Sequence, residues 1–384
     1  PGGRFAPDWM DDITGIRNWV WTEARTDPQP SSNATMTDKL SYAATGVDID
    51  ATDEVKRRMA GAINSGDKRV LNQLGAFAPL VQGTFPEMDD PLLVIKTDEP
   101  GSKQKLAIEL DTIEDLSHDL INHTVNDIVM MGAHPMYVTD CIVCGTLDKK
   151  VVPRLVDGMA DACRKQSCVL IGGETSVQPG VVTDGLFVLS ATVVGVVDRP
   201  KVVDGSKISD GDVVLAVASN GLHTNGYTLV RTLLDRRPAF GQTGLDGEPL
   251  IDVIMRPHTG YYPALRDLLG TEGLRGLAHI TGGGIVDNLV RVLPDHADAV
   301  INLNRSRVQP VFEAIRAEGN VDDDDMLRTF NLGVGLAVVC TPEAADAITS
   351  HLVGQGLDTW QIGTITKGSG QVQLEGCVHW TKTE

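Results

Sequence analysis

The chain has 384 residues, of which 42% are hydrophobic and 22% charged, so it has the composition of a globular protein long enough for two domains. Its 52 acidic residues outnumber 33 basic ones, giving a net charge of −19, which argues against general binding to nucleic acid or an anionic membrane. No run approaches the roughly 18 apolar residues of a membrane span. We expect a cytoplasmic protein without nucleic-acid or membrane partners.

The chain divides into three predicted parts. Residues 1–40 combine Pro, Trp, Asp and Arg without periodicity, so we expect an extension or a poorly ordered segment. Residues 41–205 are predicted to form an N-terminal domain and residues 206–384 a C-terminal domain. The boundary is placed there because residues 200–212 are rich in Pro, Gly, Ser and Asp and precede a new strand.

Hydrophobic periodicity predicts an α/β pattern in both domains. The N-terminal domain is expected to contain strands at 92–97, 136–143, 168–171 and 186–197, with helices at 115–131 and 151–164. The C-terminal domain is expected to contain strands at 213–218, 277–280, 333–340 and 359–365, with helices near 226–235, 285–293, 307–318 and 342–353.

The helix predicted at 115–131 carries polar groups in a regular pattern. Asp119, His123 and Asp127 follow one another every four residues and therefore share one stripe of the helix. A solvated polar face is the ordinary interpretation for the first two. Asp127 lies near the helix end, where the macrodipole is already negative, so a cation is expected to offset the repulsion. Gly132 is expected to end the helix in a left-handed conformation.

Two glycine-containing segments of the N-terminal domain carry candidate ligand groups. Asp98 follows a strand and could hold a metal, while Gly101 and Lys103 could contact a phosphate. Farther along, Gly172 to Thr175 would let a ligand approach the backbone closely with Glu174 beside it. A tight turn explains the second segment equally well.

Two segments of the C-terminal domain also combine glycine with polar side chains. In the run from Gly221 to Tyr227, Thr224 or Asn225 is a plausible helix N-cap, which leaves His223 unexplained. A neutral imidazole can donate or accept a proton near pH 7. The run Thr281-Gly282-Gly283-Gly284 opens a predicted helix, whose free N–H groups could bind phosphate, although a flexible helix start is the plainer interpretation.

Taken together, these motifs resemble the aminoimidazole ribonucleotide synthetase family, also called phosphoribosylformylglycinamidine cyclo-ligases. A wider superfamily, which includes selenide water dikinase, thiamine-monophosphate kinase and a hydrogenase-maturation dehydratase, shares Asp127 with the Gly-Ala-X-Pro run. The resemblance rests on residues 41–50, Asn126-Asp127, Gly132-Ala133-His134-Pro135, residues 172–175, residues 223–227, residues 280–284 and Phe330-Asn331.

The resemblance implies a fold and an activity. The fold would have two α/β (α+β) domains, with the N-terminal domains of two chains paired into a dimeric β-barrel, so a homodimer is expected. The activity would be ATP-dependent cyclisation of formylglycinamidine ribonucleotide to aminoimidazole ribonucleotide in de novo purine biosynthesis, with release of ADP and phosphate. Two alternatives stay open: another ATP-using enzyme of the superfamily, and a non-catalytic nucleotide-binding homologue.

The resemblance also implies roles for individual residues. It assigns Mg²⁺ to Asp98, Asp119 and Asp127, and catalysis to His223, Asn225 and Glu174. Nucleotide and phosphate binding falls to Gly101, Lys103, Gly172, Gly173, Thr175, Gly282, Gly283 and Gly284, the last three being candidates for the substrate's ribose phosphate.

Two loops depart from the family pattern. The family usually has Asp-Gly-Val-Gly-Thr-Lys where this chain has Asp98-Glu99-Pro100-Gly101-Ser102-Lys103. Glu99 adds a negative charge beside a proposed phosphate site, and Pro100 removes an N–H donor. The glycine-rich loop at 74–79 is altered as well. Both changes bear on how ATP would be held.

Overall fold

The computed structural model describes residues 49–63, 66–72 and 77–380. The predicted extension at 1–40 and most of the 41–50 motif therefore lie outside the described residues. The described residues belong to one compact unit, which contains a four-stranded sheet, a six-stranded sheet and a two-stranded ribbon.

The four-stranded sheet has the order β1-β4-β2-β3. Strand β4 runs antiparallel to both β1 and β2, whereas β2 and β3 are parallel. Its strands are β1 (Pro91–Asp98), β2 (His134–Cys144), β3 (Val169–Val177) and β4 (Phe187–Asp198). The helices of this region are α1 (Ile49–Ile63), α2 (Lys103–Leu110), α3 (Ile113–Val129) and α4 (Val151–Lys165).

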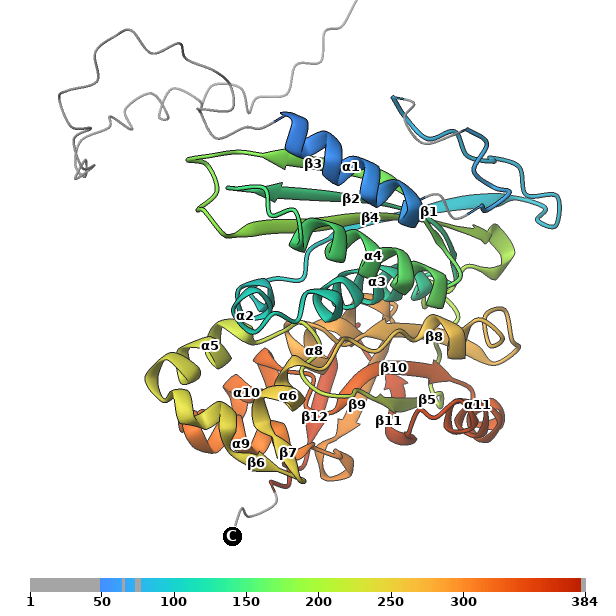
Figure 1. The fold of residues 1–384 in the computed structure, drawn as a ribbon. Helices are drawn as coiled ribbons and strands as arrows, with labels where there is room; N and C mark the ends of the chain where they lie inside the picture. Colours follow the sequence, from blue (N-terminus) through green and yellow to red (C-terminus); the bar gives the residue numbers. More distant parts are fainter. Residues whose placement is uncertain (1–48, 64–65, 73–76, 381–384) are drawn as a thin grey trace, which may run out of the picture. The chain divides into compact units, whose positions relative to one another are not determined.

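Helices α3 and α4 lie side by side and cover one face of this sheet (Figure 1). The apolar stripe of α3 explains this packing, since Leu116, Leu120 and Val125 are fully buried. The opposite face of the sheet is open at β1, where Leu93 is 61% and Ile95 63% exposed. Alternation along the strand puts these two side chains away from the helices.

The six-stranded sheet has the order β12-β9-β11-β5-β10-β8 and is antiparallel except between β12 and β9. Both faces of the sheet are buried at its inner strand β5. Leu215 and Val217 of β5 belong to a core shared with α3 and α4, whereas Val214 and Ala216 belong to a second core that includes residues of α8. The continuous apolar run of this strand follows from burial on both sides.

The remaining elements complete the C-terminal region. Its strands are β5 (Val213–Ala218), β6 (Gly244–Leu245), β7 (Glu248–Pro249), β8 (Leu274–His279), β9 (Ala297–Asn302), β10 (Val334–Cys340), β11 (Thr359–Lys367) and β12 (Val372–Glu375). Its α-helices are α5 (Tyr227–Arg236), α6 (Leu250–Met255), α7 (Tyr262–Leu265), α8 (Gly284–Leu289), α9 (Pro310–Gly319), α10 (Asp323–Thr329) and α11 (Pro342–Gly354). Short 3₁₀ turns lie at η3 (Arg199–Lys201), η4 (Pro238–Gln242), η5 (Val290–Val292) and η6 (Leu303–Arg305).

The mixed α/β class is confirmed, and two local expectations were wrong. Residues 172–175 do not form a tight turn, because β3 continues through them and pairs with β2 after a register shift. Neither Thr224 nor Asn225 is the N-cap of α5. That position belongs to Gly226, which has a φ of 79°, and the Thr224 hydroxyl instead contacts His123. No helix within the described ranges could span a bilayer.

Candidate active site at the junction of the two sheets

The polar face of α3, which carries Asn122 and Asn126 as well as the predicted stripe of Asp119, His123 and Asp127, is packed against a segment of the C-terminal region. Asn126 donates to the carbonyl of Thr259 at 2.9 Å and accepts from the N–H of Tyr261 at 2.9 Å. Asn122 donates to the carbonyl of His258 at 2.7 Å. The solvated-face interpretation is therefore wrong for Asp119 and His123, which are 0% and 8% exposed. The stripe holds the loop before α7 in place.

Lys103 and Asp119 form a fully buried ion pair, with 2.6 Å between Nζ and Oδ2. Lys103 also donates to the carbonyl of Arg256, and the N–H of His258 donates to Asp119. Burial raises the pKa of Asp119 to about 6 and lowers that of Lys103, against the attraction between them. Asp119 lies two turns, or about 12 Å, from Asp127 along the helix. Its predicted role as a metal ligand stays a prediction.

Asp98 and Asp127 converge where β1 and α3 end. Lys96 bridges them, its Nζ lying 3.2 Å from Asp98 Oδ2 and 2.9 Å from Asp127 Oδ2. Burial opposes ionisation, but hydrogen bonds from His123 and His279 prevail: the pKa of Asp98 falls to about 2, and that of Asp127 lies well below its usual range. The cation expected beside Asp127 is, in this structure, the Lys96 ammonium.

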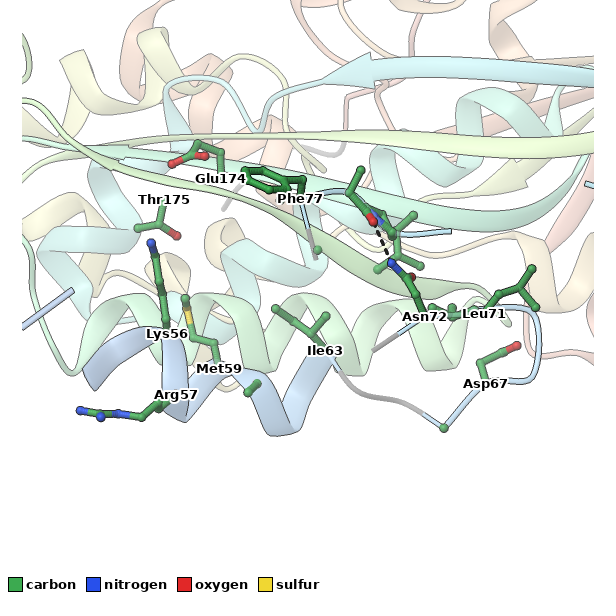
Figure 2. A pocket seen from close by; sticks show the side chains of 18 of the residues that line it. Lys56, Arg57, Met59, Ile63, Asp67, Leu71, Asn72, Phe77, Glu174 and Thr175 are labelled. Carbon is green, nitrogen blue, oxygen red and sulfur yellow. Dashed lines mark hydrogen bonds between the residues drawn. The ribbon is translucent and has the colours of Figure 1, made fainter. Parts of the chain in front are cut away.

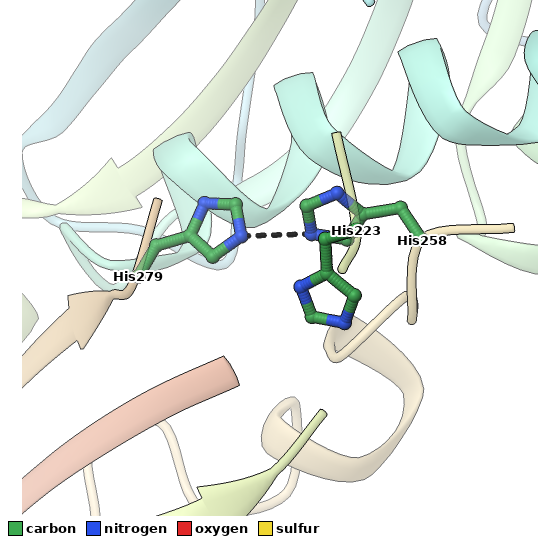
Figure 3. A group of neighbouring side chains, drawn as sticks. All are labelled: His223, His258 and His279. Carbon is green, nitrogen blue, oxygen red and sulfur yellow. Dashed lines mark hydrogen bonds between the residues drawn. The ribbon is translucent and has the colours of Figure 1, made fainter. Parts of the chain in front are cut away.

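Four imidazoles lie beside this carboxylate pair, and three of them appear in Figure 3. His258 Nε2 lies 2.9 Å from His279 Nε2, and the His223 ring stacks on the His258 ring with 3.8 Å between centroids. His279 Nδ1 lies 2.8 Å from Asp127 Oδ1. The fourth, His123, lies 3.2 Å from Asp98. Side chains from both sheets thus meet at one point.

His223 has the features of a proton acceptor. It is 1% exposed, its backbone is left-handed with a φ of 61°, and neither ring nitrogen has a hydrogen-bond partner. Burial lowers its pKa well below the usual value, so the ring is neutral at pH 7. A strained backbone and an unpaired buried imidazole are both costly to folding, which favours a functional reason for them.

Asn225 and the triple glycine lie next to each other. A side chain added at Gly282 would stand 3.4 Å from Asn225 Oδ1, and the amide nitrogen of Asn225 is buried without a partner. The N–H groups of Gly283 and Gly284 already donate to the carbonyls of Arg328 and Thr281. Phosphate binding at this short helix start stays a prediction. A phosphate there would need hydrogen-bond donors other than the N–H groups of Gly283 and Gly284.

The segment from Gly172 to Thr175 lines a different feature, a cavity of about 780 Å³ between β3 and α1. Figure 2 shows Lys56 of α1 pointing toward Thr175, and Arg57 and Lys68 also line the cavity. The lining also includes the acidic Asp67 and Glu174, so its charge is slightly positive in a strongly acidic chain, which favours an anionic ligand. The altered loop at 74–79 also borders the cavity through Phe77, Ala78 and Pro79.

The cavity and the carboxylate pair are separate within one chain. Asp98, Ala191, Asp140 and Gly173 lie opposite one another across the sheet, so three strand spacings, or about 14 Å, separate Gly173 from Asp98. The structure therefore brings together Asp98, Asp127, His223 and the residues around them, but not Glu174.

Sequence reasoning missed several members of the site. Lys96 sits inside a strand and shows no signal beyond its charge. His258 and His279 belong to no motif recognised in the sequence. They are 21 residues apart in the chain, and their rings come into contact only in the tertiary fold. Asp140 of β2 lies opposite Gly173 rather than at the junction and also went unnoticed; burial, reinforced by the nearby Glu174, raises its pKa to about 7.

Comparison with known proteins shows the class to which the chain belongs. Family models described as AIR synthase related protein match the chain at residues 83–197 (N-terminal domain) and 209–375 (C-terminal domain). These two matches together cover most of the chain and define an AIR-synthase-related protein.

Relatives identify the family more narrowly. The phosphoribosylformylglycinamidine cyclo-ligase of Methylobacillus flagellatus is 38% identical over 87% of this chain and 97% of its own length. That of Cupriavidus metallidurans is 39% identical over 87% of this chain and 96% of its own. The chain belongs to the phosphoribosylformylglycinamidine cyclo-ligase family.

Solved structures share the fold at low identity. Thiamine-monophosphate kinase from Stenotrophomonas maltophilia superposes with a TM-score of 0.62 at 18% identity, covering 85% of this chain and 96% of that one. Hydrogenase maturation protein HypE in complex with ATP gives a TM-score of 0.60 at 19% identity, covering 85% and 91%. At this identity the similarity concerns the fold alone.

Proposed function

We propose that the protein closes the imidazole ring of aminoimidazole ribonucleotide from formylglycinamidine ribonucleotide, using ATP and releasing ADP and phosphate. The observation that carries this is the match to cyclo-ligases over 87% of the chain and nearly their whole length. The site supports it, because ionised carboxylates, a neutral buried imidazole and an unpaired amide meet at one junction.

The chain's own residues suit the two halves of such a reaction. ATP would convert the formyl oxygen into a phosphate leaving group, and an amidine nitrogen would then attack that carbon. His223 would accept the proton that the attacking nitrogen loses, since it is neutral and its ring nitrogens are unpaired. Asn225 would donate its unpaired amide N–H to the amide oxygen and hold the reacting carbon in place.

Magnesium would be held by Asp98 and Asp127, and it would neutralise charge on the ATP phosphates. The fit is supported by the Lys96 ammonium, which already occupies a cation position between the two carboxylates. Asp119 would serve this site indirectly, by fixing Lys103 and the N–H of His258.

The cavity beside Gly172 to Thr175 is the proposed nucleotide pocket, in which Lys56, directed toward Thr175, would meet the phosphates. A homodimer would let this pocket meet the partner's carboxylate pair, since about 14 Å of sheet separates the two within one chain. Exposed Leu93 and Ile95 support pairing through the open sheet face, because apolar side chains gathered on one sheet face favour burial against a partner.

The function is tested by mixing the full chain with ATP, magnesium and formylglycinamidine ribonucleotide. We expect aminoimidazole ribonucleotide and ADP in equal amounts. ATP binding without that product would favour another enzyme of the superfamily, and the absence of ATP binding would favour a non-catalytic homologue.

The dimer is tested by Ile95→Glu, which puts a charge on the open sheet face. We expect the unaltered chain to sediment as a dimer and the variant as a monomer, because burying an unpaired carboxylate is costly. Val353→Glu on α11 is the matched control, since Val353 is 51% exposed on the C-terminal region. A monomeric unaltered chain, or a dimeric Ile95→Glu, would contradict the proposal.

A further inference from the structure

The buried side chain of Asn331 holds the loop that carries His223. Asn331 is 4% exposed, and its amide nitrogen donates to the carbonyl of Gly221 at 3.0 Å. Its Oδ1 accepts from the Ser219 hydroxyl at 3.1 Å and from the N–H of Gly333 at 2.8 Å. The N–H of Ser219 in turn donates to the carbonyl of Gly333 at 3.0 Å. One side chain therefore fixes the segment just before His223 to the segment just before β10.

The other end of the same loop packs on Phe330. The Phe330 side chain is buried, and a side chain added at Gly226 would collide with its ring. Gly226 is left-handed, with a φ of 79°, and is the N-cap of α5. Only a glycine leaves room for the ring at this point, so the contact fixes where the loop enters the helix.

The imidazole of His223 lies against a third glycine, Gly335 of β10. A side chain added at Gly335 would lie 2.8 Å from His223 Cε1 and would collide with the Tyr261 hydroxyl. That hydroxyl donates to the carbonyl of Ala218 at 2.9 Å, which holds it in place. Residues 330–335 thus contact the loop before His223, after it and at the ring itself.

We propose that Asn331 is a positioning residue for His223, acting together with Phe330 and Gly335. His223 has a left-handed backbone, which is costly for a residue other than glycine, and its ring nitrogens have no hydrogen-bond partner among the described residues. The contacts at both ends of the loop therefore supply the restraint that hydrogen bonds to the ring would otherwise give. A misplacement of about 1 Å can lower a rate by roughly 10²-fold. The inference rests on the proposed function, in which His223 accepts the proton.

The test is a double-mutant cycle on the full chain, with cyclisation and ATP binding measured separately. Asn331→Ala should lower kcat for cyclisation by about 10²-fold. ATP affinity should not change, because Asn331 does not line the cavity beside β3. In a His223→Asn chain, which has no acceptor to misplace, adding Asn331→Ala should change kcat by no more than about twofold. A residue that only supports the fold would cause the same loss in both backgrounds.

Asn302→Ala is the matched control. Asn302 Oδ1 accepts from the N–H two residues farther on at 3.0 Å, as Asn331 Oδ1 does, but Asn302 ends β9, which β11 separates from β5 in the sheet. Its kcat should equal that of the unaltered chain. Asn331→Asp keeps the inference testable if Asn331→Ala does not fold. It retains an acceptor for Ser219 and Gly333 and removes the donor to Gly221, so it should show the same loss.

The place of the ring is also measured without turnover, by NMR of the full chain with labelled histidine. The His223 ring signal is the one missing in His223→Asn, and Asn331→Ala should shift it, because the ring stacks on His258 with 3.8 Å between centroids. The His351 signal should stay in place. Unchanged kcat in Asn331→Ala, the same loss in both backgrounds, or an unmoved His223 signal would overturn the inference. If the unaltered chain makes no product, the proposed function fails alone, and the His223 signal then decides whether Asn331 positions the ring.

Discussion

Asp127→Asn is expected to lower ATP-dependent turnover by about 10²–10³-fold. The asparagine keeps the shape of the side chain but removes its negative charge. That charge attracts Lys96 and His279 in the structure and would attract the proposed magnesium. Steady-state assays over a magnesium series check this, since the variant should also need more magnesium to reach its lower maximum.

Asp161→Asn is the matched control, because Asp161 likewise pairs with a histidine and a lysine, His118 and Lys165, but at the surface of α4. Its turnover should equal that of the unaltered chain. Thermal unfolding of both variants separates a lost ligand from a lost fold. Unchanged turnover and magnesium dependence in Asp127→Asn would refute the metal role of Asp127.

His223→Ala is expected to lower cyclisation by about 10²–10⁴-fold while ATP still binds. Removing the ring takes away the proposed proton acceptor but leaves the cavity beside β3 intact. Burial holds the pKa of His223 well below its usual value, so the ring stays unprotonated as the pH falls from 8 to 6.5. Protonation of this group should therefore not slow the unaltered enzyme across that range.

A second variant is needed because the left-handed backbone of His223 could make the alanine variant unstable. Its φ of 61° disfavours alanine but is tolerated by asparagine, which is not a base near neutral pH. His223→Asn should therefore fold and show the same loss. His351→Ala is the control, because it removes a ring of α11 that is hydrogen-bonded to the backbone carbonyl of Ala264. Normal cyclisation by His223→Asn would reduce His223 to a structural residue.

Local patterns were sufficient for much of the fold. The strand expected at 213–218 has those limits in the structure, and the apolar stripe of α3 was predicted because a 3.6-residue period is a property of neighbouring residues. Gly132 was expected to turn the chain and has a φ of 79°, where a side chain would contact the carbonyl of Lys201 at 2.9 Å. The strand at residues 172–175 was harder to predict, because its two glycines are held in a strand by pairing with β2, which lies far away in the sequence.

The sequence by itself determined the family and the α/β class, and it singled out Asp98, Asp127 and His223 as candidate site residues, because short motifs carry them. Only the tertiary structure decided what surrounds them. Lys96, His258 and His279 come from elements far apart in the chain, and their contacts arise when the two sheets share one core. The same packing buries Asp119, which the sequence suggested was a surface acid. It is paired with the buried Lys103, because burying a carboxylate without a counter-charge would be too costly.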